Sequence, residues 1–298
     1  MPKVTVCVSV YNGADTLGPT LDSVASQRFK DFELLVLDDG STDGSAEVAE
    51  SKGACVVRQR NMGRGAALAR LMELAETEWV ALLDADDLWT PEKLERQMER
   101  AADGGVDLIH SGGWFDYPDG RSELHEKLAF PPRNSWDHIL PNNQIIASSA
   151  LFKREAILEA GNFSADTWSA CDWYGWLVMA PECKFDYIPK PLVRYKIRPG
   201  SIANRGYRFQ EGKRHVLKDL ILPRADTLFA KLSDTQAQHY RAMITRGIGV
   251  AASTMAKFLT EEGKIEEARE LHKEALKLAP GVPRVWTRAI RSVGRRRR

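Results

Sequence analysis

A run of five apolar residues that leads into three carboxylates constrains the fold of this chain more than any other stretch. Residues 79–83 read as a strand buried on both faces, which is typical of a parallel sheet. The carboxylates that follow are Asp84, Asp86 and Asp87. Because open α/β sheets bind ligands at the carboxyl ends of their strands, Asp84 and Asp86 could share Mg²⁺ or Mn²⁺ and the phosphates bound to it. The simpler interpretation is a polar strand end with an Asp helix cap before Pro91.

The first hundred residues alternate strand-like and helix-like segments. Their apolar patterns predict strands at 3–10, 32–37, 54–57 and 79–83 and helices at 16–25, 44–52, 63–75 and 91–102. This alternation predicts an α/β fold with a doubly wound, mostly parallel sheet. Since parallel strands joined by right-handed crossovers end at one edge, Tyr11, Asp39 and Asp84 should meet there.

The residues expected at that edge suit a nucleotide. Asp39, beyond the second strand, could accept a hydrogen bond from a pyrimidine N–H or a ribose hydroxyl, and a carboxylate beyond the fourth could hold a metal ion on a diphosphate. Arg64 and Arg70 follow the third strand and could reach the same place. The glycine fingerprint of dinucleotide-binding folds and the Walker A motif are missing, which argues against dinucleotide dehydrogenases and P-loop NTPases.

Five segments of this half stand in a recognisable order. They are Val8-Ser9-Val10-Tyr11-Asn12, Leu21 to Gln27, Phe32 to Asp43 with Asp38-Asp39-Gly40-Ser41 inside it, Asn61 to Arg70, and Leu83 to Asp87. In this order and spacing they resemble the nucleotide-sugar half of the family 2 glycosyltransferases, which have the GT-A fold. The resemblance implies inverting transfer of a sugar from a nucleoside-diphosphate donor, with UDP as the expected nucleotide and Mg²⁺ or Mn²⁺ as the cofactor.

The same resemblance implies a role for each residue of the donor half. Tyr11 and Arg70 line the nucleotide, and Asp39 contacts its base. Asp84 contacts the ribose or a metal-bound water, and Asp86 ligates Mg²⁺ or Mn²⁺ on the diphosphate. Asp87 is expected to cap the helix that follows, before Pro91.

In the second half of the predicted catalytic domain, the candidate for the catalytic base is Asp172. It precedes Trp176-Leu177 in the register of the family, where the matching aspartate takes the proton of the acceptor hydroxyl as its oxygen attacks the anomeric carbon. Such a base must be shielded for its basicity to rise, and Trp168, Trp173 and Trp176 could supply shielding and a sugar-stacking surface. Cys171 stands where the family usually has Glu. An ordinary helix N-cap would also explain an aspartate at this position.

Residues 188–202 match the closing strand and loop of the family. Arg198 stands where the family commonly has His, near the donor diphosphate. A guanidinium cannot ligate a metal, but it pairs with phosphate oxygens in a fork, so Arg198 is expected to share the charge of the leaving group with the cation. Lys196 is an alternative for this role, and a surface arginine is the simpler interpretation of Arg198.

From residue 207 onward the composition predicts helices, including segments at 214–230 and 237–259. Residues 261–280 resemble the second helix of a tetratricopeptide unit. Stable arrays of such units need about three copies and only one is visible, so a helical hairpin docked on the catalytic domain is the preferred interpretation.

The end of the chain, 282–298, carries a basic amphipathic pattern. Its apolar stripe consists of Val282, Val285, Trp286, Ala289, Ile290 and Val293. Arginines lie off the stripe and form the last four residues, and no acid follows Glu274. This pattern is typical of a helix on an anionic membrane surface, although a helix packed on the hairpin with a solvated tail would explain it equally well.

Composition limits the other classes of function. The net charge of +1 gives no general attraction to nucleic acid, and no recognition motif for it is present. The four cysteines lack metal-site spacing, which indicates a reducing compartment. No signal peptide opens the chain and no apolar run is long enough to span a membrane, so the expected location is cytoplasmic, with peripheral contact to the inner membrane face through the tail.

The sequence therefore predicts a GT-A catalytic domain at 1–206, with a nucleotide-sugar half at 1–103 and an acceptor half at 104–206, and a C-terminal α-helical extension at 207–298. The resemblance to the family implies that the acceptor is a hydroxyl of a glycan or a lipid-linked sugar. Two alternatives stay open. A nucleotidyltransferase of similar fold would usually carry a Gly-rich basic loop after the first strand, and a non-catalytic adaptor would act through the helical C-terminus.

Overall fold

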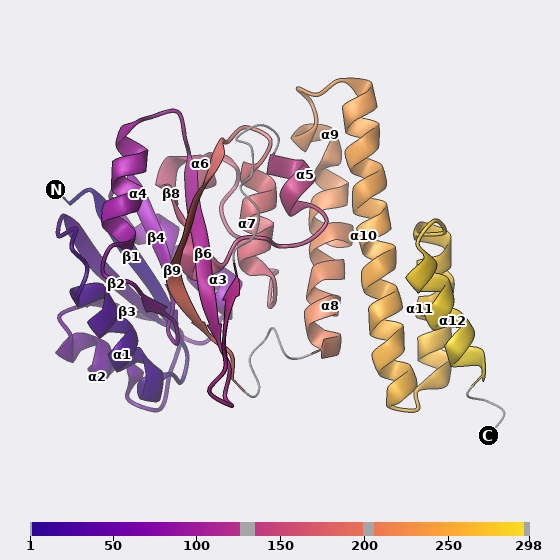
Figure 1. The fold of residues 1–298 in the computed structure, drawn as a ribbon, viewed down its shortest axis with the longest axis horizontal. Coiled ribbons are helices and arrows are strands. Elements are labelled where there is room, and N and C mark those ends of the chain that lie inside the picture. Colours follow the sequence, from indigo (N-terminus) through magenta and orange to yellow (C-terminus); the bar gives the residue numbers. More distant parts are fainter. Residues whose placement is uncertain (1, 126–134, 199–205, 295–298) are drawn as a thin grey trace. The chain divides into compact units, whose positions relative to one another are not determined.

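The computed structural model describes residues 2–125, 135–198 and 206–294 of the chain. The chain divides into two compact units (Figure 1). The sheet unit comprises Met1–Ile139 and Asn143–Pro199, and the helical unit comprises Leu140–Asn142 and Gly200–Arg298. Each unit has buried apolar clusters of its own.

A mixed sheet forms the centre of the sheet unit. Its described strands lie in the order β3-β2-β1-β4-β8-β6-β9-β5, and β7 pairs with β6. Their bounds are β1 Val4–Val10, β2 Phe32–Asp38, β3 Cys55–Arg58, β4 Trp79–Asp84, β5 Leu88–Trp89, β6 Leu108–Asp116, β7 Ser122–His125, β8 Leu151–Lys153 and β9 Phe185–Lys196. The described helices of the unit are α1 Ala14–Ala25, α2 Ser45–Ser51, α3 Arg64–Leu74, α4 Lys93–Ala102, α5 Ser135–Ile139, α6 Arg154–Glu159 and α7 Cys171–Met179.

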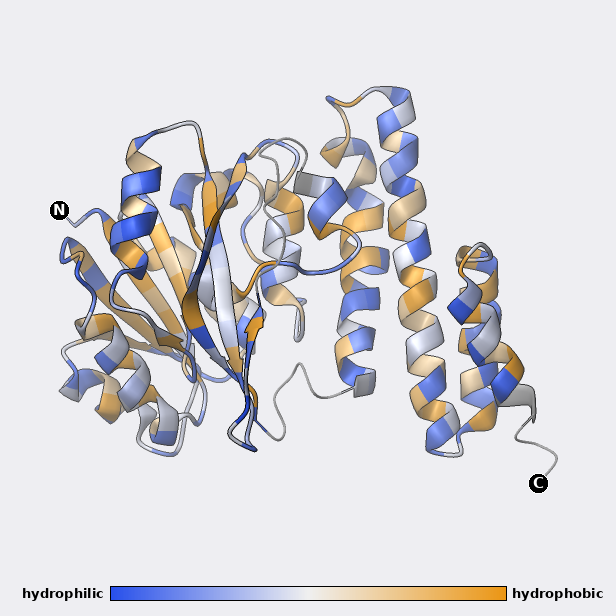
Figure 2. Cartoon of the chain, viewed as in Figure 1, coloured by the Kyte–Doolittle hydropathy of each residue, from blue (hydrophilic) through white to orange (hydrophobic). Residues whose placement is uncertain are grey.

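The four strands predicted from the first hundred residues form the parallel part of the sheet. β1 pairs in parallel with β2 and β4, and β2 pairs in parallel with β3. Val4, Val6 and Val8 on one face of β1 are fully buried, and Thr5 and Cys7 on the opposite face are 0% and 1% exposed, as a strand covered on both faces requires. Figure 2 shows hydrophobic residues concentrated in these strands. The predicted α/β fold with a mostly parallel sheet is confirmed.

In the second part of the sheet, one short strand runs opposite to both of its neighbours. β8 runs antiparallel to both β4 and β6, and β6 pairs in parallel with β9. The β6–β9 ladder shifts register at Gly112 and Gly113, where an added Cβ on Gly113 would lie 2.9 Å from the Val193 carbonyl oxygen. The close backbone approach at this bulge explains a glycine inside a strand.

A buried hydroxyl fixes the turn that follows β4. Ser148 lies in the short 3-10 turn Ala147–Ser149, and its Oγ accepts a hydrogen bond from the Asp84 N–H at 3.0 Å. The same hydroxyl donates to Asp87 Oδ2 at 2.5 Å, and Asp87 Oδ1 accepts from the Lys196 N–H of β9 at 3.0 Å. The Asp84–Asp87 turn is therefore tied both to the 3-10 turn and to the last long strand.

The prediction that Asp87 caps the next helix is wrong. α4 begins at Lys93, not at Pro91, and the Leu94 N–H in its first turn donates to the Gln27 side chain at 3.0 Å. Asp87 is fully buried instead, and burial, together with the charges of Asp84 and Asp86, raises its pKa. A carboxyl group in that position needs the two donors described above.

The described helices of the helical unit are α8 Gly206–His215, α9 Ala225–Leu228, α10 Asp234–Glu261, α11 Ile265–Leu278 and α12 Pro283–Gly294. The continuous helix predicted at 214–230 is wrong, because a π-helical segment, Val216–Ile221, and a 3-10 turn, Leu222–Arg224, separate α8 from α9. Pro223 stands at this break, where its missing N–H prevents regular helical hydrogen bonding. Among the described residues, no helix has both the length and the apolar character needed to cross a membrane.

The α10–α11 hairpin packs through small side chains, and α12 adds to it. Ala252, Ala275 and Val285 belong to one buried cluster. Val285 of α12 is fully buried, whereas Trp286 and Ile290 are 48% and 67% exposed. The first turn of α12 is thus packed on the hairpin. Large parts of the Trp286 and Ile290 side chains stay exposed, although the Trp286 indole donates to the Pro280 carbonyl at 2.8 Å. The predicted basic tail at 295–298 lies outside the described residues.

Replacing Ser148 by alanine should destabilise the protein. The substitution leaves the buried Asp87 carboxyl and the Asp84 N–H each without one partner, which we expect to cost about 2–3 kcal/mol of unfolding free energy. Urea unfolding would measure it. The matched control is Ser149→Ala, because the buried Ser149 hydroxyl donates only to the Ile146 carbonyl of its own turn. Equal losses in the two variants would contradict this account of the turn.

Candidate active site

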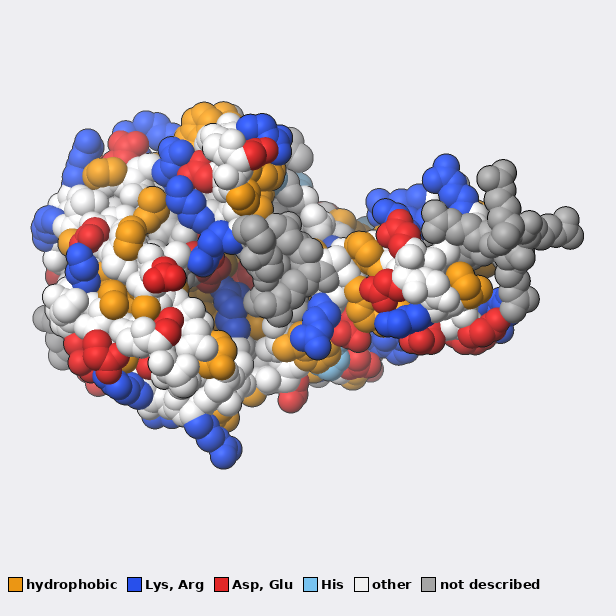
Figure 3. All heavy atoms as spheres, turned by 90° about the horizontal axis from the view of Figure 1, so that it is seen from below, with side chains coloured by type: hydrophobic (Ala, Val, Ile, Leu, Met, Phe, Trp, Pro, Cys, Tyr) orange, Lys and Arg blue, Asp and Glu red, His pale blue; other side chains and the backbone are white. Residues whose placement is uncertain are grey.

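The carboxyl edge of the parallel strands brings the predicted donor-site residues together. Val10 pairs in register with Asp38, and Ser9 with Asp84, so the residues that follow β1, β2 and β4 lie at one edge. The loops there are joined, since the Asn12 N–H donates to Ser41 Oγ at 2.9 Å and Asn12 Oδ1 accepts from the Thr42 N–H at 2.8 Å. Figure 3 shows basic and acidic side chains gathered around a hollow in the sheet unit.

Asp39 organises the loop that leads into α3. Its Oδ1 accepts from Gln59 Nε2 at 2.7 Å and from the Met62 N–H at 2.9 Å, and its Oδ2 accepts from the Gly63 N–H at 2.8 Å. The residue is only 4% exposed. A carboxylate has about four acceptor positions, so these three bonds leave one on Oδ2.

Tyr11 and Arg70 are exposed, and each lies next to a residue that hydrogen-bonds Asp39: Val10 precedes Tyr11, and Gln59 contacts Arg70. Tyr11 directly follows β1 and is 54% exposed. Arg70 lies on α3, and its Nη1 is 3.4 Å from Oε1 of Gln59, the residue whose amide also donates to Asp39. Both side chains are therefore available to a bound molecule beside the Asp39 carboxylate.

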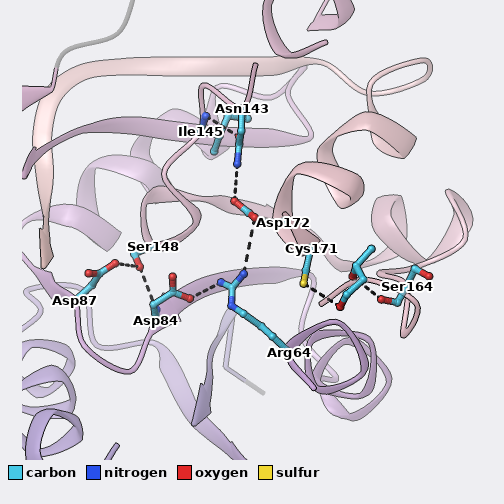
Figure 4. A network of polar contacts seen from close by, with 10 residues as sticks. Arg64, Asp84, Asp87, Asn143, Ile145, Ser148, Ser164, Cys171 and Asp172 are labelled. Carbon is cyan, nitrogen blue, oxygen red and sulfur yellow. Dashed lines mark hydrogen bonds and ion pairs between the residues drawn. The ribbon is translucent and has the colours of Figure 1, made fainter. Parts of the chain in front are cut away.

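Arg64 joins two of the predicted site carboxylates (Figure 4). Its Nη2 donates to Asp84 Oδ1, and its Nη1 lies 3.8 Å from Asp172 Oδ1. Burial acts to lower the pKa of Arg64, but the charges of Asp84 and Asp172 outweigh it and raise that pKa. The predicted donor contact and the predicted base, 88 positions apart in the sequence, are thus linked by one cation.

Asp172 lies in the first turn of α7, with its side chain only 13% exposed. Besides the Arg64 contact, its Oδ2 accepts a hydrogen bond from Asn143 Nδ2 at 2.7 Å. Burial raises the pKa of Asp172, Arg64 opposes that rise and Asp84 adds to it. A shielded carboxylate with raised basicity can accept a proton from a hydroxyl brought within reach.

The aromatic residues around Asp172 differ from expectation. Trp173 and Trp176 are fully buried, so the predicted sugar-stacking role is wrong for both of them. Trp176 packs edge-on against Phe152, and the Trp173 indole donates to the Ile139 carbonyl at 2.7 Å. Trp168 alone of the three is exposed, at 45%. The buried Cys171 thiol donates to the Thr167 carbonyl at 3.2 Å, and burial raises its pKa.

Asp86 and Arg198 form an ion pair at the other side of the Asp84–Asp87 turn. Arg198 Nη2 donates to Asp86 Oδ2, and Nε donates to the same oxygen at 3.1 Å. Burial, followed by the charge of Asp84, raises the pKa of Asp86 against the effect of Arg198. Lys196, the alternative basic residue, pairs with Asp116 at 2.7 Å. The Arg198 side chain therefore lies at the acidic turn, whereas Lys196 contacts this turn only through its backbone N–H.

The residues at this turn fit a hard divalent cation that is held together with a substrate. Asp84 and Asp86 are two hard oxygen donors one residue apart, and their mutual repulsion is part of what raises the pKa of Asp86. Within residues 2–125, 135–198 and 206–294, no group of three or more His, Cys, Asp or Glu side chains is placed to hold a metal ion. Mg²⁺ commonly uses one or two carboxylates and completes its shell with water and substrate phosphates, so this donor set is sufficient only in that mode.

Sequence reasoning missed several partners in this network. The roles of Asn143, Ser148 and Gln59 carry no local signal, because each depends on a residue far away in the chain. The position of Arg64 after the third strand predicts that it lies near the edge, but the sequence does not predict its contact with Asp172. A basic residue in the first turn of a helix is unfavourable for the helix dipole, and this could have marked Arg64 as a special position.

Comparison with known proteins identifies the class of site. A model of "Glycosyl transferase family 2" matches residues 5–159, just over half of the chain. The UDP-Glc:alpha-D-GlcNAc-diphosphoundecaprenol beta-1,3-glucosyltransferase WfaP of Escherichia coli is 24% identical over 227 residues, which are 74% of this chain and 87% of that protein.

Solved structures share the fold. The crystal structure of S. aureus TarS 1-349 in complex with UDP-GlcNAc superposes with a TM-score of 0.64 at 18% identity and covers 96% of this chain and 90% of that one. The mannosyltransferase PcManGT from Pyrobaculum calidifontis, in complex with GDP-Man and Mn2+, gives a TM-score of 0.58 at 20% identity over 98% and 87% of the two chains. The chain belongs to glycosyl transferase family 2, and it is a nucleotide-sugar-dependent glycosyltransferase with the GT-A fold.

Proposed function

We propose that this glycosyltransferase inverts the anomeric centre as it moves a sugar from a UDP-linked donor to a hydroxyl of a glycan or a lipid-linked acceptor. The observation that carries the proposal is the buried Asp172 carboxylate, whose pKa is raised and which one arginine links to the donor-side Asp84. UDP is favoured because a relative is a UDP-Glc-dependent transferase and a structure of the same fold holds UDP-GlcNAc.

The donor nucleotide is proposed to lie along β1, β2 and α3. The acceptor position left on Asp39 Oδ2 suits the N–H of a pyrimidine base, while Gln59 and the two backbone N–H groups hold the carboxylate in place. Tyr11 and Arg70 cover the nucleotide from both sides of Asp39. Asp84 contacts the ribose or a water on the cation.

The diphosphate is proposed to bind at the turn after β4, with Asp86 as the protein ligand of Mg²⁺ or Mn²⁺. A bound divalent cation would neutralise charge that develops on the leaving diphosphate. Arg198 pairs with Asp86 in the structure. When a diphosphate binds, its guanidinium group can pair with phosphate oxygens instead and so balance part of the charge that develops on the leaving diphosphate. The structure of PcManGT with GDP-Man and Mn2+ supports a cation in this fold.

Asp172 is proposed to act as the general base. The acceptor oxygen attacks the anomeric carbon as its proton moves to the Asp172 carboxylate, and the bond from that carbon to the diphosphate breaks. This single displacement inverts the configuration and requires no covalent enzyme intermediate. A lipid-linked acceptor is supported by the E. coli relative, whose name gives a diphosphoundecaprenol acceptor.

Asp172→Asn and Asp86→Asn should each reduce transfer by about 100-fold or more, the first through loss of the base and the second through weaker binding of the metal–diphosphate complex. Because only the ionised Asp172 accepts a proton and its pKa is raised, the wild-type rate should fall at low pH, starting above the range of an ordinary aspartate. Asp107→Asn is the control, because Asp107 is 25% exposed, pairs with Lys153 and lies outside the site. A wild-type rate in Asp172→Asn would remove the base assignment.

We further propose that α12 and the basic residues after it contact an anionic membrane surface. Trp286 and Ile290 are exposed one helical turn apart, and Arg284 and Arg291 are exposed on the same helix. A group of basic side chains stands at one edge of the helical unit in Figure 3. With no acid after Glu274, each arginine near such a surface contributes about 1 kcal/mol.

Vesicle sedimentation tests this surface. The protein should bind vesicles that contain phosphatidylglycerol and not vesicles of phosphatidylcholine alone, and binding should weaken as salt is raised. Trp286→Ser with Ile290→Ser should weaken binding about tenfold or more, while Leu124→Ser, a 45% exposed apolar residue of β7, should not. Binding that is unaffected by the double substitution, or equal on neutral vesicles, would refute a membrane role for α12.

A further inference from the structure

Arg64 occupies a position where its positive charge is unfavourable for its own helix. It is the first residue of α3, where a positive charge opposes the helix dipole, and α3 has no acidic residue in its first turn. Its side chain is only 23% exposed, so the guanidinium has lost most of its hydration. Such a placement needs compensation from elsewhere, and Asp84 and Asp172 provide it.

The three charged groups come from three different elements. Arg64 begins α3, Asp84 ends β4 and Asp172 lies in the first turn of α7 (Figure 4). The exposed fractions of the two carboxylate side chains are 26% and 13%. In so shielded a place each contact is stronger than on the surface, and the geometry of one group constrains the others.

The backbone around Arg64 is built for this approach. Gly63 adopts a φ of 86°, and its N–H is held by Asp39, so the loop delivers the chain into α3 at a fixed angle. An added Cβ on Gly65 would lie 2.2 Å from the Ser164 carbonyl oxygen and 2.4 Å from Thr167 Oγ1. The loop that precedes α7 therefore packs directly on the first turn of α3, which brings Asp172 to Arg64.

We propose that Arg64 is a positioning residue that fixes the Asp172 carboxylate relative to Asp84, and thereby aligns the proton acceptor with the bound donor. This inference rests on the proposed function of Asp172 as the base. The guanidinium hydrogen-bonds Asp84 through Nη2 and faces Asp172 with Nη1, which lies 3.8 Å from Asp172 Oδ1 as an ion pair. A lysine ammonium is a single point charge and cannot span both in the same way.

The arrangement has an electrostatic consequence. The charged and titratable groups that face Asp172 are Arg64 from α3, Asp84 from β4 and Cys171 from α7, and the Asn143 amide donates to it. Arg64 acts to lower the pKa of Asp172, whereas burial and Asp84 raise it. Removing the guanidinium should therefore raise the pKa of Asp172, and the loss of activity at low pH should begin at a higher pH.

The experiment compares Arg64→Gln and Arg64→Lys with Arg58→Gln. Arg58 is the matched control, since it also bridges two carboxylates, Glu47 at 2.9 Å and Glu50 at 3.0 Å, but on an exposed surface. Arg64→Gln should lower kcat about tenfold or more and move the acidic limb of the kcat profile to higher pH. The thermal stabilisation by UDP and Mn²⁺ should remain, and Arg64→Lys should recover only part of kcat. Arg58→Gln should match the wild type.

A double-mutant cycle then asks whether Arg64 acts through Asp172. If it does, adding Arg64→Gln to Asp172→Asn should lower kcat by less than about twofold, because the group it positions is already inactive. Additive losses, an unmoved acidic limb, or full recovery in Arg64→Lys would each overturn the inference. These outcomes require a wild-type enzyme that transfers sugar. A wild-type protein that is stabilised by UDP and Mn²⁺ but transfers no sugar from any UDP-linked donor would instead refute the proposed function.

Discussion

Crowded negative charge at the end of β4 is the constraint on which the sheet unit depends. Three carboxylates lie within four residues, and each is balanced by a different part of the chain. Asp84 receives a guanidinium from α3, Asp86 receives one from the segment after β9, and Asp87 receives a hydroxyl and a backbone N–H. None of these donors is local, so the turn can take this form only when the surrounding elements have assembled.

The side of the site that is proposed to bind the nucleotide sugar is also held by hydrogen bonds between residues far apart in the chain. Asp39 ties the loop before α3 to the end of β2, and that loop sets the position of Arg64. A carboxylate proposed to contact the nucleotide is thus also a structural member of the fold. The site is a polar network at the carboxyl ends of buried apolar strands. In this network, residues proposed to bind substrate are hydrogen-bonded to residues that only hold them in place.

The parallel half of the fold and the family could be predicted from sequence because both depend on local patterns. Buried parallel strands such as β1 are continuous apolar runs, and Asp84 and Asp86 follow one directly. What failed depends on distant partners. Asp87 resembles a cap until Ser148 and Lys196 are brought to it, and Trp173 and Trp176 resemble a sugar surface until the burial of α7 is known. The break between α8 and α9 is not visible in the apolar spacing, and only Pro223 marks its place in the sequence.

The Ser148 hydroxyl complicates the interpretation of scanning mutagenesis at this site. It bonds to the Asp84 backbone on one side and to the Asp87 carboxyl on the other. An alanine scan through the acidic turn would combine three different defects in one measurement: loss of the Asp84 carboxylate that pairs with Arg64, loss of the Asp86 carboxylate that pairs with Arg198, and a displaced backbone at Asp87. Reduced turnover alone would label all three as catalytic, and only a separate measurement of folding would tell a reacting group from the scaffold that holds it.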